Sequence, residues 1–268
     1  ESTHAIPGRR AVTERSKQGL ATRSIHGQGL RDAHGSPHVP VYDTTTFAFG
    51  STAELLDVIE GRKPGSLYTR YGMNPSILAL ENTLAGLEGA ELAWAFSSGM
   101  AAESALFLAH GRDGIVCIGD AYGGTLELLA KQLPLLGITT HLLLGSEMDR
   151  LEAVLAGGAR LVFLETPTNP TLDVFDIRAI ARQAHAHGAL LAVDNTFASP
   201  VNQRPLELGA DLVTHSATKY LGGHSDLTAG VLMGARELLL PVWEWRKNLG
   251  STIAPATASL LSRSLRTL

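Results

Sequence analysis

The sequence predicts an α/β fold, with a mostly parallel seven-stranded sheet sandwiched by helices. Seven short apolar runs are spaced along the chain, and stretches with helical periodicity lie between most of them. Runs such as 161–164 and 189–193 are apolar on both faces, as in a central strand that helices cover on each side. Because strands and helices alternate, we expect the sheet to be mostly parallel.

The strands are expected at the apolar runs 91–96, 114–119, 139–144, 160–165, 189–194, 211–215 and 228–233. The clearest helix begins at Asn74-Pro75, where the asparagine can cap the first turn and proline suits the first helical position. Its apolar residues recur at helical spacing until Gly89 ends the run. Further helical patterns lie near 100–110, 124–136, 148–156 and 176–187, and in 234–268.

The composition is that of a globular protein, with 268 residues of which 44% are hydrophobic. Lys+Arg 22 against Asp+Glu 26 leaves no basic excess, so we expect no nucleic-acid partner. No apolar run approaches the ~20 residues that a bilayer span needs, and the first residues lack a secretion-signal pattern. We therefore expect no membrane association and a cytoplasmic location. The lone Cys117 lies in an apolar run and is expected to be an inert core thiol.

Composition also divides the chain into two parts. Residues 1–50 are rich in Gly, His, Pro and Thr and lack a sustained period, so they are expected to form an N-terminal arm. Two interpretations of the arm stay open: it docks on a neighbouring subunit, or it is a loose terminus. Residues 51–268 are expected to form one large domain.

Polar side chains follow five of the seven predicted strands. In an open α/β sheet, ligands bind outside the carboxyl ends of the strands. We therefore expect these clusters to meet at one edge of the sheet and to form a ligand site. They are residues 97–100, 120–125, 165–170, 194–196 and 216–219.

One end of this expected site suits a phosphate group. Ser98, Gly99 and Met100 open a predicted helix, whose first backbone N–H groups can bind an anion, and the glycine permits close approach. Ser216 and Thr218 can add hydroxyl donors.

Three other residues suit an aromatic ring that carries a nitrogen and an aldehyde. Tyr122 can stack on the ring, Asp194 can pair with a protonated ring nitrogen, and Lys219 can supply an amine to the aldehyde. Pyridoxal phosphate has all of these features, and a lysine Schiff base with an acidic partner at the ring nitrogen is its usual arrangement. The sequence therefore predicts pyridoxal 5'-phosphate as the cofactor.

Each of these residues has an ordinary structural interpretation when taken alone. A glycine after two serines is typical of a turn, Asp194 is compatible with a loop start or helix cap, and Tyr122 precedes two glycines that suit a turn. A single lysine such as Lys219 is usually solvated. The prediction depends on their joint placement at one edge.

Other motifs give weaker hypotheses. Residues 216–219 match the S-x-x-K motif of serine β-lactamases, but the accompanying S-D-N and K-T-G motifs are missing. Neither a P-loop nor a G-x-G-x-x-G pattern is present. His185 and His187 are two residues apart and face different directions on a helix, so no metal site is expected. His215 and His224 flank Lys219 and are interpreted as either site-lining or structural.

Five longer stretches, in this order, resemble a known family. They are Ser98–Ala102, Tyr122–Thr125, Glu165–Pro170, Asp194–Pro200 and His215–Asp226. The family is the Cys/Met-metabolism group of pyridoxal-phosphate enzymes, which includes cystathionine γ-synthase, cystathionine γ- and β-lyases, O-acylhomoserine sulfhydrylases and methionine γ-lyase. The resemblance extends from about residue 20 to the end of the chain. It implies that residues 51–268 form the cofactor-binding large domain of the aminotransferase-like fold type I.

The resemblance also implies residue roles. Lys219 would hold the cofactor covalently and shuttle protons, Asp194 would pair with the pyridine nitrogen, and Tyr122 would stack on the ring and assist proton transfer. Asn169 would lie near the ring hydroxyl. The residues implied to bind the phosphate are Gly99, Met100, Ser216 and Thr218.

The pair Tyr68 and Arg70 looks like the one with which family members reach the phosphate site of a neighbouring subunit, and an arginine fork suits that anion. If so, a homodimer with shared sites is the minimum active unit, and a tetramer of two such dimers is expected.

Three departures from the family pattern stand out. Arg70 and Asn74 are four residues apart instead of three, and Ser76 replaces a threonine. The family's smaller C-terminal domain, which carries an arginine for the substrate carboxylate, is expected to be absent from this chain. Gly124 stands where methionine γ-lyases usually place a reactive cysteine, which counts against that activity.

The function implied by the resemblance is trans-sulfuration: γ-replacement or γ-elimination on a homoserine ester or cystathionine, as in cystathionine γ-synthase and γ-lyase. O-acylhomoserine sulfhydrylase and cystathionine β-lyase remain alternatives. A hypothesis of another class is a fragment that binds the cofactor and dimerises but is catalytically inert.

Overall fold

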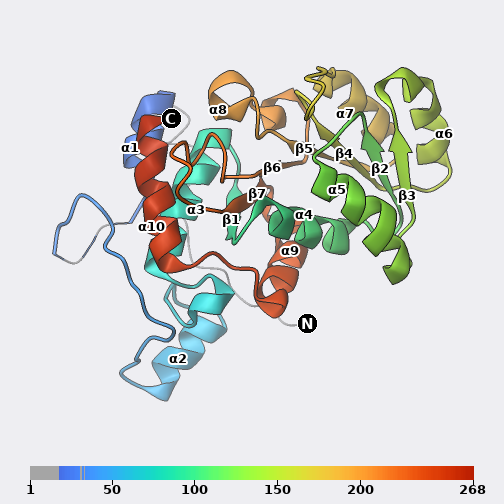
Figure 1. The fold of residues 1–268 in the computed structure, drawn as a ribbon. Helices are drawn as coiled ribbons and strands as arrows, with labels where there is room; N and C mark the ends of the chain where they lie inside the picture. The colour runs from blue at the N-terminus through green and yellow to red at the C-terminus, as the bar shows by residue number, and fades with distance from the viewer. Residues whose placement is uncertain (1–17, 31, 33) are drawn as a thin grey trace.

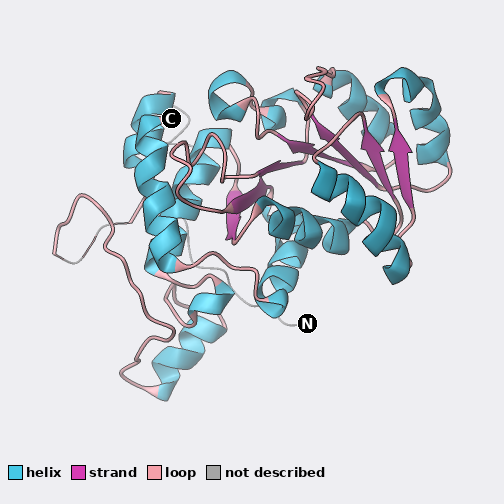
Figure 2. Cartoon of the chain, in the orientation of Figure 1, coloured by secondary structure: helices cyan, strands magenta, loops and turns pink. Residues whose placement is uncertain are grey.

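A computed structural model describes residues 18–30, 32 and 34–268 of the chain (Figure 1). The first seventeen residues of the predicted arm therefore lie outside the described residues. The described part is a helix–sheet–helix arrangement (Figure 2).

The sheet has seven strands in the order β1-β7-β6-β5-β4-β2-β3. Strand β7 runs antiparallel to its neighbours β1 and β6, and the other neighbouring pairs are parallel. The predicted mostly parallel, seven-stranded sheet is confirmed, and each expected run coincides with one strand, although β7 extends one residue beyond its run. The strands are β1 (Leu92–Phe96), β2 (Ile115–Ile118), β3 (Thr140–Leu143), β4 (Leu161–Glu165), β5 (Leu190–Asp194), β6 (Leu212–His215) and β7 (Gly230–Gly234).

Helices cover both faces of the sheet (Figure 1). One face packs against α4 (Gly99–His110), α5 (Gly123–Glu127) with the helical turns that follow it, and α9 (Arg236–Leu249). The other face packs against α3 (Pro75–Glu88) and α10 (Pro255–Ser264) at one end, and α6 (Leu151–Ala156) and α7 (Ile177–Ala186) at the other.

Strand β4 shows why the sheet needs two covering layers. All five of its residues are buried. Because side chains alternate across a strand, Phe163 packs on one face and Val162 and Leu164 on the other. The Phe163 ring meets Phe107 of α4 edge-on, with centroids 5.1 Å apart. The continuous apolar runs of the sequence are therefore explained by burial from both sides.

The segment 234–268, predicted to be helical, contains two helices. Gly250 ends α9 with a φ of 73°, a left-handed conformation that favours glycine, and Pro255 occupies the first turn of α10. Between them, Thr252 forms a β-bridge with Phe96 at the end of β1.

The described part of the arm is not wholly extended. It contains α1 (Leu20–His26), which packs against α3, and Arg23 Nη1 donates to the carbonyl of Gly86 at 2.7 Å. A second short helix, α2 (Thr52–Ile59), extends away from the layered body in Figure 1, and α8 (Ser199–Asn202) follows β5.

Cys117 is buried in β2, as predicted, and burial raises the pKa of its thiol. No helix among the described residues is long and apolar enough to cross a membrane. Within the same part of the chain, no group of three or more His, Cys, Asp and Glu side chains is arranged to hold a metal ion.

Candidate active site at the carboxyl edge of the sheet

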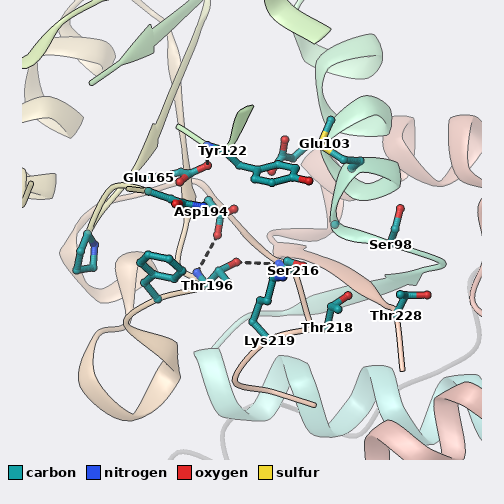
Figure 3. A pocket seen from close by; sticks show the side chains of 15 residues that line it. Ser98, Glu103, Tyr122, Glu165, Asp194, Thr196, Ser216, Thr218, Lys219 and Thr228 are labelled. Carbon is teal, nitrogen blue, oxygen red and sulfur yellow. Dashed lines mark hydrogen bonds between the residues drawn. The ribbon is translucent and has the colours of Figure 1, made fainter. Parts of the chain in front are cut away.

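The residues that follow β1, β2, β4, β5 and β6 meet around one cavity of about 220 Å³ (Figure 3). These strands are mutually parallel, so their carboxyl ends share one edge of the sheet. The prediction that the five polar clusters converge is confirmed.

Hydroxyl groups and the N-terminus of α4 form one end of the cavity. Ser98 caps α4, because its hydroxyl accepts a hydrogen bond from the N–H of Ala101 at 3.1 Å. The N–H groups of Gly99 and Met100 lie in the first turn, where a helix offers them no acceptor. Ser216 and Thr218 line the same end, and the Thr218 hydroxyl accepts a hydrogen bond from the N–H of Ala229 at 3.0 Å.

Gly99 is the point of closest packing at this end. A Cβ atom placed on Gly99 would lie 2.9 Å from the Cβ of Ser216, closer than two such carbons approach in proteins. The absence of a side chain therefore lets α4 and the loop after β6 bring their donors to one small volume, as an anion site requires.

Carboxyl groups form the other end of the cavity. Glu165 and Asp194 end β4 and β5 as direct register partners. Glu165 Oε1 accepts the N–H of Tyr122 at 2.6 Å, and Asp194 Oδ1 accepts the N–H of Thr196 at 2.7 Å. Glu103 reaches the cavity from α4. Figure 3 shows these carboxyl groups at the end occupied by Tyr122, away from Ser98 and Thr228.

All three carboxyl groups hold their protons more tightly than usual. Burial, with the nearby Asp194 charge, raises the pKa of Glu165 to about 8 and that of Glu103 well above its ordinary range. Burial also raises the pKa of Asp194, although Thr196 and His215 oppose the rise. Because a buried cation offsets such a cluster, this end of the cavity favours a positively charged ring nitrogen.

Tyr122 and Lys219 complete the cavity. Tyr122 precedes α5, and its side chain is 52% exposed, so the ring is available to a ligand. Lys219 lies on the loop after β6 and is exposed, and its amine makes no hydrogen bond or ion pair with another described residue. Asn169 also lines the cavity. An amine, an aromatic face, an acidic end and an anion end thus surround one volume.

Tyr68 and Arg70 lie elsewhere. Tyr68 lines a second, more apolar cavity, and the Arg70 guanidinium donates to the backbone carbonyl of Lys247. The same guanidinium lies 5.3 Å from the centre of the Tyr68 ring and 5.0 Å from that of Tyr71. The structure therefore does not bring this pair to the cavity of its own chain.

Three residues that line the cavity lie outside the five clusters of the sequence analysis: Glu103, Phe197 and Thr228. Glu103 had a detectable signal, because it shares the buried stripe of α4 with Ala102 and Leu106. An acidic residue at a core position of a helix needs a polar partner. Thr228 gave no such signal.

The cavity fits an aromatic phosphate with a cationic ring nitrogen, held beside a lysine, and the sheet is that of fold type I enzymes that use pyridoxal phosphate. The donor sets at the two ends match the two ends of that cofactor. Residues 21–268 match the family described as Cys/Met metabolism PLP-dependent enzyme. The chain belongs to this family.

Proteins that are similar to this chain support the family assignment. The chain is 41% identical to an L-methionine gamma-lyase of Pseudomonas deceptionensis over 93% of its own length and 64% of the relative's. It is 40% identical to a cystathionine beta-lyase of Lactococcus lactis subsp. cremoris, with the same coverages of 93% and 64%. The structure of cystathionine gamma synthase from Xanthomonas oryzae pv. oryzae, in complex with aminoacrylate and cysteine, matches with a TM-score of 0.86 at 35% identity, over 93% of this chain and 63% of the other. The chain thus spans just under two thirds of the length of these proteins.

Proposed function

We propose that the protein is a pyridoxal-phosphate-dependent trans-sulfuration enzyme that carries out γ-replacement or γ-elimination on a homoserine ester or cystathionine. The observation that carries the proposal is that Lys219 and Asp194 line the same cavity as the N-terminus of α4. The family membership of residues 21–268 supports the same cofactor.

When bound, pyridoxal phosphate supplies an electron sink for the negative charge left when an amino acid loses its α-proton. Lys219 would hold this group through its amine, and Nζ would take the proton from the α-carbon of the substrate and deliver a proton to a neighbouring carbon. Among the described residues, the exposed Lys219 amine makes no hydrogen bond or ion pair, so the loop beyond β6 leaves it free to move.

Asp194 would pair with the protonated ring nitrogen, and its hydrogen bond from Thr196 keeps its carboxylate in place. Tyr122, whose backbone is anchored by Glu165, would stack on the ring. Asn169 would lie near the ring hydroxyl. The first turn of α4 at Gly99 and Met100 and the hydroxyls of Ser216 and Thr218 would bind the phosphate.

Tyr68 and Arg70 would act in the site of a second copy of the chain, which is supported by neither of them lining the cavity of its own chain. Arg70 is exposed and carries the fixed positive charge that a phosphate needs. A homodimer with shared sites is therefore the smallest active unit, and we expect two such dimers to form a tetramer.

The choice of γ over β chemistry is supported by the cystathionine gamma synthase structure described above. The relative named cystathionine beta-lyase keeps β-elimination as a second candidate. O-acylhomoserine sulfhydrylase remains a third, with the same site. Relatives named as lyases and synthases give no support to the inert cofactor-binding fragment.

The cofactor is tested first. Wild-type protein mixed with pyridoxal phosphate is expected to absorb visible light, and borohydride reduction followed by peptide mass spectrometry is expected to place the label on Lys219. Lys219→Ala removes both signals. Lys131→Ala, which changes an exposed lysine paired with Glu127, is the control and retains them. A label on another lysine contradicts the assignment.

Products then test the reaction. γ-Elimination of cystathionine yields cysteine, 2-oxobutyrate and ammonia, whereas β-elimination yields homocysteine, pyruvate and ammonia. γ-Replacement joins cysteine to an O-acylhomoserine and releases the carboxylic acid. Oxobutyrate or cystathionine is the expected product. Pyruvate as the only keto acid rejects γ chemistry in favour of β-elimination.

A further inference from the structure

Glu103 is a buried acid that has no role in the chemistry proposed above. Its side chain belongs to the second turn of α4, is 4% exposed, and nevertheless lines the candidate active site. A carboxyl group at such a position is costly unless it is neutral or fully hydrogen-bonded. We therefore considered what its two oxygens contact.

Glu103 interacts with two polar side chains of the site. The Thr125 hydroxyl donates to Oε2 at 2.6 Å. The carboxyl group also shares a hydrogen bond with the carboxyl group of Asp194. Two carboxyl groups can share a hydrogen bond only if one of them carries a proton. The pair therefore holds one proton between them.

The surroundings decide which acid keeps that proton. Asp194 accepts the Thr196 N–H and has His215 nearby, and both favour its charged form. Glu103 has the Asp194 and Glu165 carboxyl groups nearby, which favour its neutral form, and only the Thr125 hydroxyl opposes them. Glu103 is thus the donor, and Asp194 is the charged acceptor.

We propose that Glu103 is a positioning residue for the ring-nitrogen site: as a neutral acid bound to Thr125, it donates a hydrogen bond to Asp194 and fixes the carboxylate that faces the cofactor ring. This inference rests on the proposed function, because it assigns Glu103 a role toward the bound cofactor. Figure 3 shows Glu103 and Asp194 at the same end of the cavity, beside Tyr122.

The donated hydrogen bond has two effects. It spreads part of the Asp194 charge onto a neighbour, so the carboxylate competes less strongly for the proton of the ring nitrogen. It also fixes one Asp194 oxygen, as Thr196 does from the other side, so the carboxylate enters the complex already oriented. Both effects favour a protonated ring and tighter cofactor binding.

The test compares Glu103→Gln with Glu103→Leu. Glutamine keeps an amide N–H that can donate to Asp194 and an oxygen that can accept from Thr125, whereas leucine fills similar space and keeps neither. Glu127→Gln on the surface of α5 is the matched control, since Glu127 pairs only with the exposed Lys131. Each protein is loaded with isotope-labelled pyridoxal phosphate, and the ring-nitrogen chemical shift and the dissociation constant are measured.

We expect Glu103→Leu to move the ring-nitrogen shift toward the unprotonated value and to weaken cofactor binding about tenfold, the effect of losing one hydrogen bond to a charged group. Glu103→Gln is expected to keep the wild-type shift and to bind within about twofold. A merely structural role would not move the ring-nitrogen shift. An unchanged shift in Glu103→Leu, or a Glu103→Gln protein that behaves like Glu103→Leu, overturns the proposal.

A second measurement needs neither the leucine variant nor the cofactor. Infrared difference spectra of cofactor-free wild type and Glu103→Gln are expected to show one protonated carboxyl C=O band that the variant lacks. If no such band is lost, Glu103 is not the donor. A wild-type protein that takes up no cofactor on Lys219 would defeat the proposed function, while this spectrum would still decide the state of Glu103.

Discussion

His215 Nε2 lies 2.6 Å from Glu88 Oε1, with both side chains fully buried beneath the candidate site. Glu88 is the last residue of α3, and its same oxygen accepts a hydrogen bond from Asn195 Nδ2 at 2.9 Å. Asn195 follows Asp194, and His215 precedes Ser216. One carboxyl group therefore joins α3 to the ends of β5 and β6, beside Asp194 and the hydroxyl donors of the site.

We predict that Glu88→Leu destabilises the protein by about 3–5 kcal/mol, because it leaves His215 Nε2 and one N–H of Asn195 without an acceptor, while the other N–H of Asn195 still donates to the Gln203 carbonyl. Glu88→Gln keeps one acceptor oxygen and is expected to cost less, about 1–3 kcal/mol. Urea unfolding of the cofactor-free protein measures both. Equal losses in the two variants would show that the buried hydrogen bonds do not set the stability.

We predict that Gly99→Ala weakens cofactor binding by about tenfold and destabilises the fold by about 1–3 kcal/mol, because the new methyl group meets Ser216. Gly123→Ala is the control, since a Cβ at Gly123 meets no atom within 4 Å. Fluorescence titration with pyridoxal phosphate gives the affinities. Similar losses in both variants would indicate a general effect on glycine-rich turns rather than crowding at the anion end.

The raised pKa of Glu165 predicts that the stability of the fold depends on pH. Its pKa rises from 4.5 to about 8 on folding, so the folded protein holds this proton more tightly than the unfolded chain does. The stabilisation is fully present below about pH 4.5 and is lost as the pH rises through about 8.

We therefore expect the cofactor-free protein to become less stable between about pH 5 and pH 8, and Glu165→Gln to lose stability less steeply over that range. Thermal unfolding at several pH values measures the two slopes. Glu127→Gln, at an exposed acid, should keep the wild-type slope. A Glu165→Gln slope as steep as that of the wild type contradicts the prediction.

The Arg246–Glu81 ion pair has no exposed surface, and Arg246 also donates to the carbonyl of Ala95 at 3.1 Å. We predict that Arg246→Leu costs about 3–5 kcal/mol, since it leaves a buried carboxylate without its cation. Arg150→Leu removes the cation of a surface pair with Glu147 and is expected to leave the stability almost unchanged. Chemical denaturation separates the two, and comparable losses would contradict this account.

If sites are shared between subunits, two inactive variants should complement each other. Arg70→Ala and Lys219→Ala are each expected to lack activity, whereas a mixed dimer contains one site with both defects and one with neither. Subunit exchange of equal amounts should restore about a quarter of the wild-type activity by random pairing. Failure to recover activity, despite exchange shown by mass spectrometry, would place Arg70 in the site of its own chain.

The sheet was predictable because its strands are buried on both faces, so that runs such as 161–165 are apolar throughout. The convergence of the five clusters followed from strand direction, which brings the carboxyl ends of parallel strands to one edge. Asp194 was found because it ends β5, and Gly99 and Lys219 were found because they lie within four residues of the ends of β1 and β6.

Other features depend on contacts between distant residues. Glu103 was missed because its partner Asp194 is 91 positions further along the chain, and a glutamate in a helix is usually solvated. The helix α1 is short, and its contact with α3 rather than its own periodicity holds it. The placement of Tyr68 and Arg70 depends on the fold of the segment before α3, for which the sequence has no strong period.

Cys117 is the single cysteine of the chain and is 1% exposed within β2. Maleimide dyes and spin labels react with accessible thiolates, so we expect the buried native thiol not to react with them. A cysteine introduced at an open surface position such as Gly123 can therefore carry one reporter group beside Tyr122, without first removing any native residue. Because the native thiol is buried, a single introduced cysteine is enough to place a spectroscopic label at the cavity.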